Sequence, residues 1–196
     1  MEQSKQQHKG RWNLFAIIAI CAAPIVASYI TYYLIKPQAR TNYGALIDPR
    51  LYPIPVLGAV TLDGKPIALD AFRGKWIMLQ VDTADCAQTC REKLYEMRQL
   101  RLTQGKEMDR IERVWLITDA QPIETMLMRE YDGTRMLRVK SAPLNAWLPV
   151  EPGTVPADHI YMIDPRGNLM MRFPKGGDPS KMKKDISKLL KASSIG

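Results

Sequence analysis

KWIMLQVDTADCAQTC, residues 75–90, joins an apolar run to a pair of thiols. The near-continuous apolar run at 75–81 predicts a strand that is buried on both faces. Cys86 and Cys90 follow at the point where this strand should give way to a helix that runs from Ala87 to about Thr103. Residues four apart lie on one helix face, so both sulfurs can reach the same metal ion or the same redox partner. A helix N-terminus favours the thiolate, which is both the nucleophile of disulfide exchange and a ligand for soft metals. The stretch therefore predicts a redox site or a metal site.

The segments on either side of this stretch predict an α/β domain. A second buried strand at 113–118 follows the helix, so the two strands should be parallel and joined by a right-handed crossover. The other expected elements are a hairpin at 56–70 that turns at Asp63-Gly64, a short helix at 122–130, strands at 159–163 and 168–173, and a basic amphipathic helix at 179–192. Residues 136–157 are ambiguous. This order of elements predicts a thioredoxin-like α/β sandwich.

The N-terminal part of the chain predicts a transmembrane helix. Residues 12–35 contain no charged side chain, and a segment of this length can cross a bilayer with some tilt. Trp12 at one end and the tyrosines at the other suit the two membrane interfaces. A core helix would need a polar face, and a signal peptide would need a shorter apolar core. We therefore expect an uncleaved single anchor in which Cys21 is a small apolar residue facing lipid.

The charges around this helix predict its orientation. Three basic residues precede it and two follow it, which favours a cytoplasmic N-terminus. The expected organisation is a cytoplasmic tail at 1–11, a transmembrane helix at 12–35, a proline-rich tether at 36–55 and a thioredoxin-like domain at 56–196. The domain would then face an oxidising compartment, such as the periplasm outside a bacterial inner membrane, where a dithiol meets disulfide chemistry.

The net charge of the chain is +8, which marks a basic protein. A basic surface next to anionic lipid headgroups accounts for this charge. A nucleic-acid-binding surface would need basic residues interleaved with stacking aromatic side chains, and the domain is poor in them. Nucleic acid is therefore excluded as a partner.

His159 is the one histidine of the expected domain, and it stands at the mouth of the strand at 159–163. A lone histidine at a strand end commonly makes a loop hydrogen bond. In a thioredoxin-like sheet, however, the loop before this strand packs beside the dithiol, which would bring Cys86, Cys90 and His159 together. Two thiolates and an imidazole suit Cu(I), and also Cu(II) with an added ligand, whereas zinc usually takes a fourth ligand.

These residues resemble the Sco/SenC family of copper-binding assembly proteins for cytochrome c oxidase. The resemblance rests on the anchor, the Cys86-x-x-x-Cys90 pair after a buried strand, and Asp158-His159 ahead of the run at 163–167, IDPRG. It covers about 140 residues, from near Pro53 to the C-terminal helix. The family usually has a proline after each cysteine, and this chain has Ala87 and Arg91 there.

The resemblance implies a function, a set of ligands and a partner. Cys86, Cys90 and His159 would hold copper, as Cu(I) or Cu(II), and Asp158 would orient the loop. The partner would be the copper-site subunit of cytochrome c oxidase, so the protein would be a metallochaperone more than an enzyme.

Two alternatives stay open. The pair can act as a thiol–disulfide oxidoreductase on the cysteines of the oxidase copper site, with Cys86 as the nucleophile and Cys90 as the resolving thiol. The chain can also be a non-catalytic assembly scaffold with a vestigial disulfide, a reading that Asp85 favours because an anion beside Cys86 opposes thiolate formation.

Overall fold

The computed structural model of the chain describes residues 3–35, 42–193 and 195, without the side chains of residues 3–11, 14, 34 and 35. The chain divides into two compact units, Met1–Thr41 and Asn42–Gly196. The parts of the predicted tail and tether at 1–2 and 36–41 lie outside the described residues.

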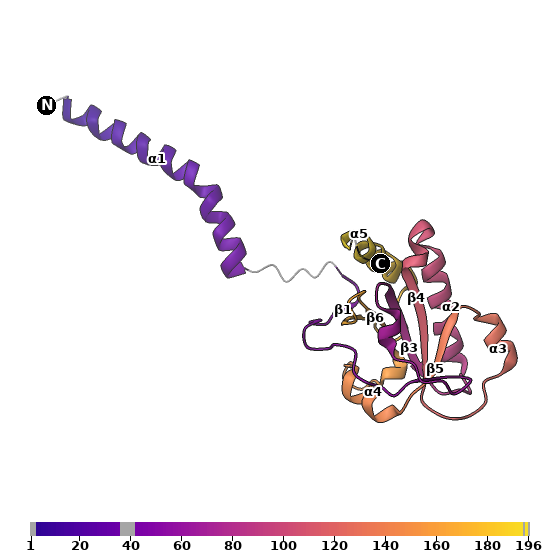
Figure 1. Cartoon of the computed structure of the whole chain (residues 1–196). Helices are drawn as coiled ribbons and strands as arrows, with labels where there is room; N and C mark the ends of the chain where they lie inside the picture. The colour runs from indigo at the N-terminus through magenta and orange to yellow at the C-terminus, as the bar shows by residue number, and fades with distance from the viewer. Residues whose placement is uncertain (1–2, 36–41, 194, 196) are drawn as a thin grey trace. The chain divides into compact units, whose positions relative to one another are not determined.

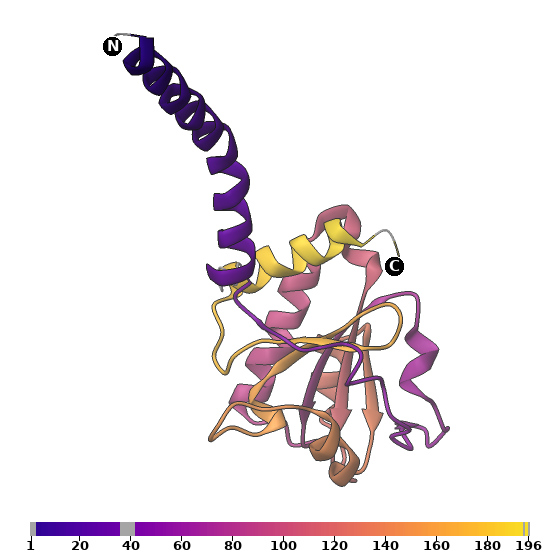
Figure 2. The ribbon, with the colours of Figure 1, turned by 90° about the vertical axis from the view of Figure 1, so that its left-hand side faces the viewer.

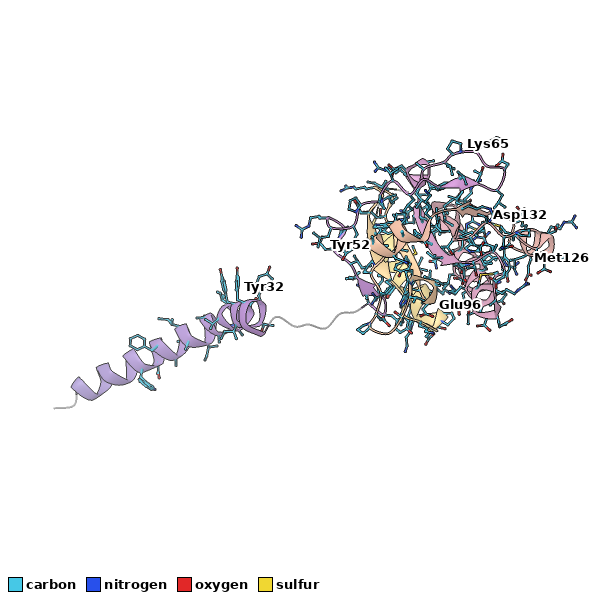
Figure 3. All side chains as sticks on the ribbon, turned by 90° about the horizontal axis from the view of Figure 1, so that it is seen from below. Tyr32, Tyr52, Lys65, Glu96, Met126 and Asp132 are labelled. Atoms are coloured by element: carbon cyan, nitrogen blue, oxygen red, sulfur yellow. A yellow bond between two sulfur atoms is a disulfide. The ribbon has the colours of Figure 1, made fainter. Side chains whose placement is uncertain are left out.

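The described residues of the first unit form one long helix. It comprises α1 (Gln3–Ile30) followed by a π-helical turn, η1 (Thr31–Ile35). Within it, Phe15–Tyr33 has a mean hydropathy of 2.0 over 19 residues and none of that window is buried, so the helix is long and apolar enough to cross a membrane. Tyr32 projects from the end of the helix (Figure 3). This unit is a candidate membrane anchor or signal sequence.

The second unit is a thioredoxin-like α/β domain (Figure 1), which confirms the predicted fold class. Its strands are β1 (Ala45–Leu46), β2 (Val60–Thr61), β3 (Trp76–Asp82), β4 (Ile111–Ile117), β5 (Thr134–Arg138), β6 (Ile160–Ile163) and β7 (Leu169–Arg172). Its α-helices are α2 (Gln88–Leu102), α3 (Thr125–Glu130), α4 (Ser141–Trp147) and α5 (Pro179–Ala192). Three 3₁₀ turns complete it: η2 (Leu69–Phe72), η3 (Gly105–Arg110) and η4 (Pro156–Asp158).

The strands form one mixed sheet in the order β1-β7-β6-β3-β4-β5-β2. β3, β4 and β5 are parallel, and β6 runs antiparallel to β3 with Gln80 opposite Ile160. The side chains of β3 alternate between the two faces of the sheet. On one face, Trp76 and Met78 pack with buried side chains of α2 and α5. On the other face, Ile77 and Leu79 pack with buried side chains of α4. Figure 2 shows α5, in yellow, beside α2.

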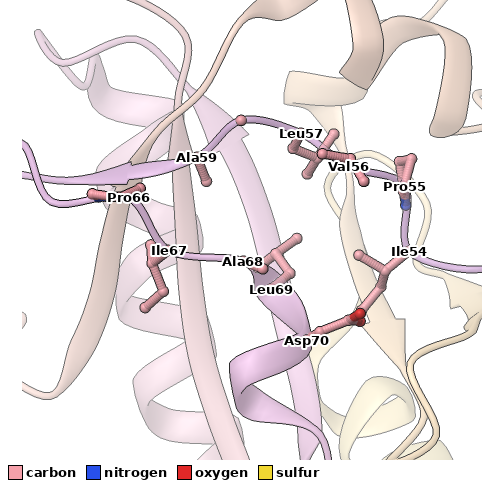
Figure 4. A pocket seen from close by; sticks show the side chains of 11 residues that line it. Ile54, Pro55, Val56, Leu57, Ala59, Pro66, Ile67, Ala68, Leu69 and Asp70 are labelled. Atoms are coloured by element: carbon pink, nitrogen blue, oxygen red, sulfur yellow. The ribbon is translucent and has the colours of Figure 1, made fainter.

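We call the face covered by α2, α3 and α5 the α2 face, and the other the α4 face. The α4 face is covered by Leu144 and Trp147 of α4, by Leu69 of η2, and by the irregular segment that precedes β2. This segment also forms an apolar pocket of about 310 Å³ with Pro66–Asp70 (Figure 4). The pocket contains none of the predicted site residues.

Residues 42–55, which the sequence assigned to the tether, fold with the domain. β1 pairs with β7, and Ile47, Tyr52 and Ile54 pack on the core. The carboxylate of Asp185, buried in α5, accepts hydrogen bonds from the backbone N–H groups of Tyr43 (2.6 Å) and Gly44 (2.9 Å). The prolines of this segment predicted a tether, and the contacts that fix it come from β7, α5 and the core, far away in the sequence.

Two other elements go beyond the sequence prediction. β5 begins at Thr134, just before the region 136–157 that the sequence left ambiguous, and ends within it, so the parallel part of the sheet has three strands. The predicted turn at Asp63-Gly64 is present, and the segments on either side of it pair in antiparallel fashion: the Thr61 N–H bonds the Lys65 carbonyl at 2.8 Å, and Val60 bridges to Pro66. The sequence did not predict that β2 also pairs with β5 at the edge of the sheet.

Candidate functional site

Cys86 and Cys90 form a disulfide at the carboxyl end of β3. The two sulfurs are bonded, and the Cα atoms lie 5.1 Å apart. Both side chains are fully buried, with 0% of their surface exposed. Leu94 of α2, Trp115 of β4 and Leu127 of α3 pack around them. A thiol reagent or a partner protein therefore meets the sulfurs only after local opening of the chain.

A tight turn connects β3 to the disulfide. The Cys86 N–H bonds the Thr83 carbonyl at 3.2 Å, and Cys86 has a positive φ of 40°, which is uncommon for a residue other than glycine. α2 begins after Cys86, so only Cys90 lies within the helix. Asp85 is exposed, and its carboxylate accepts a hydrogen bond from the Thr83 hydroxyl.

Two side chains hold this turn from outside. The carboxylate of Asp119, after β4, accepts the Ala84 N–H at 3.2 Å. The guanidinium of Arg91 donates to the Cys86 carbonyl at 3.2 Å and forms an ion pair with Glu124 at 2.6 Å. The hydrogen bond to Glu124 raises the pKa of Arg91 above its ordinary value. Arg91, one of the positions where Sco/SenC proteins usually have proline, thus fixes the backbone of Cys86.

Gln80 is a buried polar residue beside the disulfide. It lies on the α2 face of β3 with 0% of its surface exposed, and its Nε2 lies 3.7 Å from Sγ of Cys90. Its Oε1 has no hydrogen-bond partner among the residues that the structure describes. A buried acceptor without a donor is unusual in a folded protein.

Lys93 is a buried cation one helical turn beyond Cys90. Its ammonium pairs with the carboxylate of Asp82 at 3.1 Å and also donates to the carbonyl of Ala157 in η4. Burial lowers the pKa of Lys93, and the attraction of Asp82 offsets part of this change. Lys93 therefore connects the helix of Cys90 to the loop that precedes His159.

His159 is fully buried just before β6, and both of its ring nitrogens have partners. Nδ1 lies 2.9 Å from the carbonyl oxygen of Phe173, and Nε2 lies 2.8 Å from Oγ1 of Thr154. Because a carbonyl oxygen only accepts, Nδ1 carries the proton and Nε2 accepts from the Thr154 hydroxyl. The hydroxyl has one hydrogen, so Nε2 shares it in alternation with the Glu151 carbonyl, which lies 2.8 Å from the same oxygen. Burial lowers the pKa of His159, so the ring is neutral at pH 7.

His159 lies on the α4 face, opposite the disulfide. Its ring contacts that of Tyr161, two residues further along, with centroids 5.9 Å apart. Tyr161 belongs to the cluster of the α4 face, whereas Cys90 contacts Gln80 on the α2 face. Over residues 3–35, 42–193 and 195, no group of three or more His, Cys, Asp or Glu side chains is arranged to hold a metal ion.

The predicted ligands therefore do not form a copper site in this conformation. The two sulfurs are bonded to each other, and the imidazole is on the other side of the sheet.

The carboxylate of Asp158 contacts the backbone of the loop before His159 and a lysine beyond β7. One carboxylate oxygen accepts the Val155 N–H at 3.1 Å, and the other pairs with Lys175 at 2.8 Å. The hydrogen bond from Lys175 holds the pKa of Asp158 below its ordinary value. The same loop borders a cleft of about 380 Å³ at the carboxyl ends of β3 and β4, lined by Thr83, Thr118 and Thr154 among others.

We expect His159 to make the domain less stable in mild acid. The unfolded ring takes up a proton near its ordinary pKa of about 6.5, but the buried ring resists it, so stability falls as the pH drops from 6.5 toward the lowered pKa. The loss is about 1.4 kcal/mol for each unit by which burial lowers the pKa.

Urea unfolding at about pH 7.5 and pH 5.5 measures this effect, compared between the wild type and His159→Gln. The difference between the two pH values should be smaller in the variant. The only other histidine is His8, outside the domain, so an unchanged difference would contradict the prediction.

Sequence reasoning missed Gln80 and Lys93 as members of the site. Gln80 is the one polar residue of an apolar run, and Lys93 stands within the apolar stripe of α2. Each is a polar residue that interrupts a hydrophobic pattern in the strand or helix beside the cysteine pair, and that signal was present in the sequence.

Residues 76–193 match the model of a protein family described as "transmembrane-like, thioredoxin-like, C-terminal domain". The chain belongs to this family. The match spans more than half of the chain and begins at β3, so it includes the disulfide, Lys93 and His159. No curated protein matches the chain in sequence.

Several solved structures share the fold of this family member at low identity. Yeast Sco1 is 13% identical with a TM-score of 0.57 over 72% of this chain and 99% of its own. BsSco, a member of the Sco family of cytochrome c oxidase assembly proteins in which a disulfide switch was identified, is 13% identical with a TM-score of 0.54 over 74% and 98%. The thioredoxin domain of a thiol-disulfide oxidoreductase from Bacteroides vulgatus is 17% identical with a TM-score of 0.50 over 70% and 97%. These likenesses show a thioredoxin-like fold.

Proposed function

We propose that this protein is a membrane-anchored assembly factor for cytochrome c oxidase that acts by thiol–disulfide exchange at Cys86 and Cys90. The observation that carries the proposal is the disulfide itself, at the junction of β3 and α2, with His159 on the opposite face of the sheet. Within the part of the chain that the structure describes, no third His, Cys, Asp or Glu completes a metal site with the pair, and two cysteines that bond to each other in this way are suited to redox chemistry.

In the proposed reaction, the reduced pair attacks a disulfide between the copper-site cysteines of the oxidase subunit. Cys86 forms a mixed disulfide and releases one substrate thiol. Cys90 then attacks Cys86, which closes the Cys86–Cys90 bond and releases the second substrate thiol. Two electrons and two protons pass from the protein to the substrate, and a dithiol reductant regenerates the pair. The anchor places the domain outside a bacterial inner membrane, with the N-terminus cytoplasmic.

The test uses the full chain in detergent with Cys21→Ala, so that Cys86 and Cys90 are its only thiols. The reduced protein is mixed with an oxidised peptide that carries the copper-site cysteines of the oxidase subunit. Thiol alkylation and mass spectrometry should then find one protein disulfide for each peptide dithiol. A reduced protein that never exchanges with the peptide or with glutathione would refute the proposal.

Copper delivery through Cys86, Cys90 and His159 is the second candidate. The observation that favours it is the tautomer of His159: Nδ1–H donates to a backbone carbonyl, as in many metal-binding imidazoles, and Nε2 keeps its lone pair. Thr154 can release Nε2, because the Glu151 carbonyl accepts the same hydroxyl. Copper binding would also require reduction of the disulfide and movement of the loop at 151–159, so this function ranks second. One solved structure of yeast Sco1 does hold copper.

An anaerobic titration of the reduced protein with Cu(I) against a competing chelator separates the candidates. One tightly bound equivalent that is lost in His159→Ala supports the chaperone. No binding by a protein that exchanges disulfides supports the oxidoreductase. A protein with neither property would be a scaffold.

A further inference from the structure

The amide of Gln80 is mismatched to the oxidised form of the cysteine pair. Its Nε2 donates to Sγ of Cys90 at 3.7 Å, a weak hydrogen bond. Its Oε1 is buried and finds no donor within the described part of the chain. Neither sulfur of a disulfide carries a hydrogen, so the bonded pair offers Oε1 nothing. The oxidised state therefore includes a buried, unpaired acceptor, which is unfavourable.

Reduction creates a hydrogen-bond donor beside the Gln80 amide. The Cys86–Cys90 bond breaks as it takes up two electrons and two protons from a dithiol reductant, and each sulfur becomes a thiol. Sγ–H of Cys90 is then a hydrogen-bond donor beside the Gln80 amide. The terminal torsion of glutamine is broad and two-fold, so a rotation of the amide brings Oε1 to the thiol and moves Nε2 to the position that Oε1 held. The gain on reduction is the exchange of a weak N–H···S contact for an S–H···O hydrogen bond.

We propose that Gln80 is a positioning residue of the redox pair: it accepts a hydrogen bond from the Cys90 thiol and so favours the reduced state. This inference rests on the proposed redox function and adds a determinant of the reduction potential. It also makes the two thiols unequal. Cys90 is held against the sheet by the amide, whereas Cys86 lies in the turn outside α2 and is left to attack a substrate.

Gln80→Met tests the proposal, because methionine keeps the length of the side chain without the amide. Its equilibrium with reduced and oxidised glutathione should shift toward the disulfide by about tenfold, which lowers the reduction potential by about 30 mV. Gln99→Met, the same exchange at a position of α2 beyond Cys90, should leave the potential unchanged. An unchanged or raised potential in Gln80→Met, with the control at the wild-type value, would overturn the inference.

A second measurement reads the hydrogen bond directly. In a chain with Cys21→Ala and Cys86→Ala, Cys90 is the only thiol and no new acceptor lies beside it, so its S–H stretching band reports whether the hydrogen is donated to Gln80. The band should move to higher frequency when Gln80→Met is added, while thermal unfolding confirms that the variant is folded. A band that does not move would refute the role of Gln80. If the wild-type pair does not equilibrate with glutathione at all, the proposed function fails, and the S–H band still tests the hydrogen bond.

Discussion

Cys90→Ser should trap a lasting mixed disulfide between Cys86 and glutathione, whereas the Cys90 thiol of Cys86→Ser should react at least about tenfold more slowly. The reason is the difference in the local opening that each sulfur requires. Cys86 lies in a turn whose backbone is held by two side-chain hydrogen bonds, one to Asp119 and one from Arg91. Cys90 lies in the first turn of α2 and packs against Trp115. A tenfold difference in rate corresponds to about 1.4 kcal/mol of additional opening free energy.

The measurement is the rate of adduct formation with oxidised glutathione, followed by mass spectrometry in the Cys21→Ala background. The control is the same reaction in urea, where both thiols are exposed and the two variants should react alike. In the wild type the adduct should be transient, because Cys90 displaces the glutathione. Equal rates in the folded proteins, or a faster reaction at Cys90, would reverse the assignment of nucleophile and resolving thiol.

The strand and helix at the dithiol were predictable because their signals are local. The apolar run of β3 and the helical stripe of α2 identified both elements within one or two residues. β5 was not predictable in this way, because its TRMLR sequence contains only two buried positions, Met136 and Leu137. Its place in the sheet comes from pairing with β4 and from the core on both sides.

The sequence identified the two cysteines of the candidate site. It did not predict on which face of the sheet the His159 ring lies relative to them. The position of His159 at the start of β6 was correct to within one residue. The face on which the ring lies depends on strand register, since a shift of one residue reverses it. The pairing of Gln80 with Ile160 sets that register, and no spacing in the sequence encodes it.

Lys93→Met should lower the free energy of unfolding by about 3 kcal/mol, and Tm by roughly 6–12 °C for a domain of this size. Methionine fills the space of the lysine stem, so the loss comes from the ammonium. Without it the Asp82 carboxylate, whose side chain is 17% exposed, keeps a buried charge without its cation. The Ala157 carbonyl also loses a donor. Lys184→Met, at an exposed position of α5, is the matched control and should change stability by less than about 0.5 kcal/mol.

The pH dependence of the same variant separates charge from packing. Because burial lowers the pKa of Lys93 below its ordinary value of 10.5, the native protein loses this proton before the unfolded chain does. The contribution of Lys93 to stability therefore rises with pH between the lowered pKa and 10.5. Urea unfolding across this window should show a rise in the wild type that is smaller in Lys93→Met. Two parallel pH profiles would mean that the lysine acts through its stem, and the link between α2 and η4 would then be a packing contact instead of an ionic one.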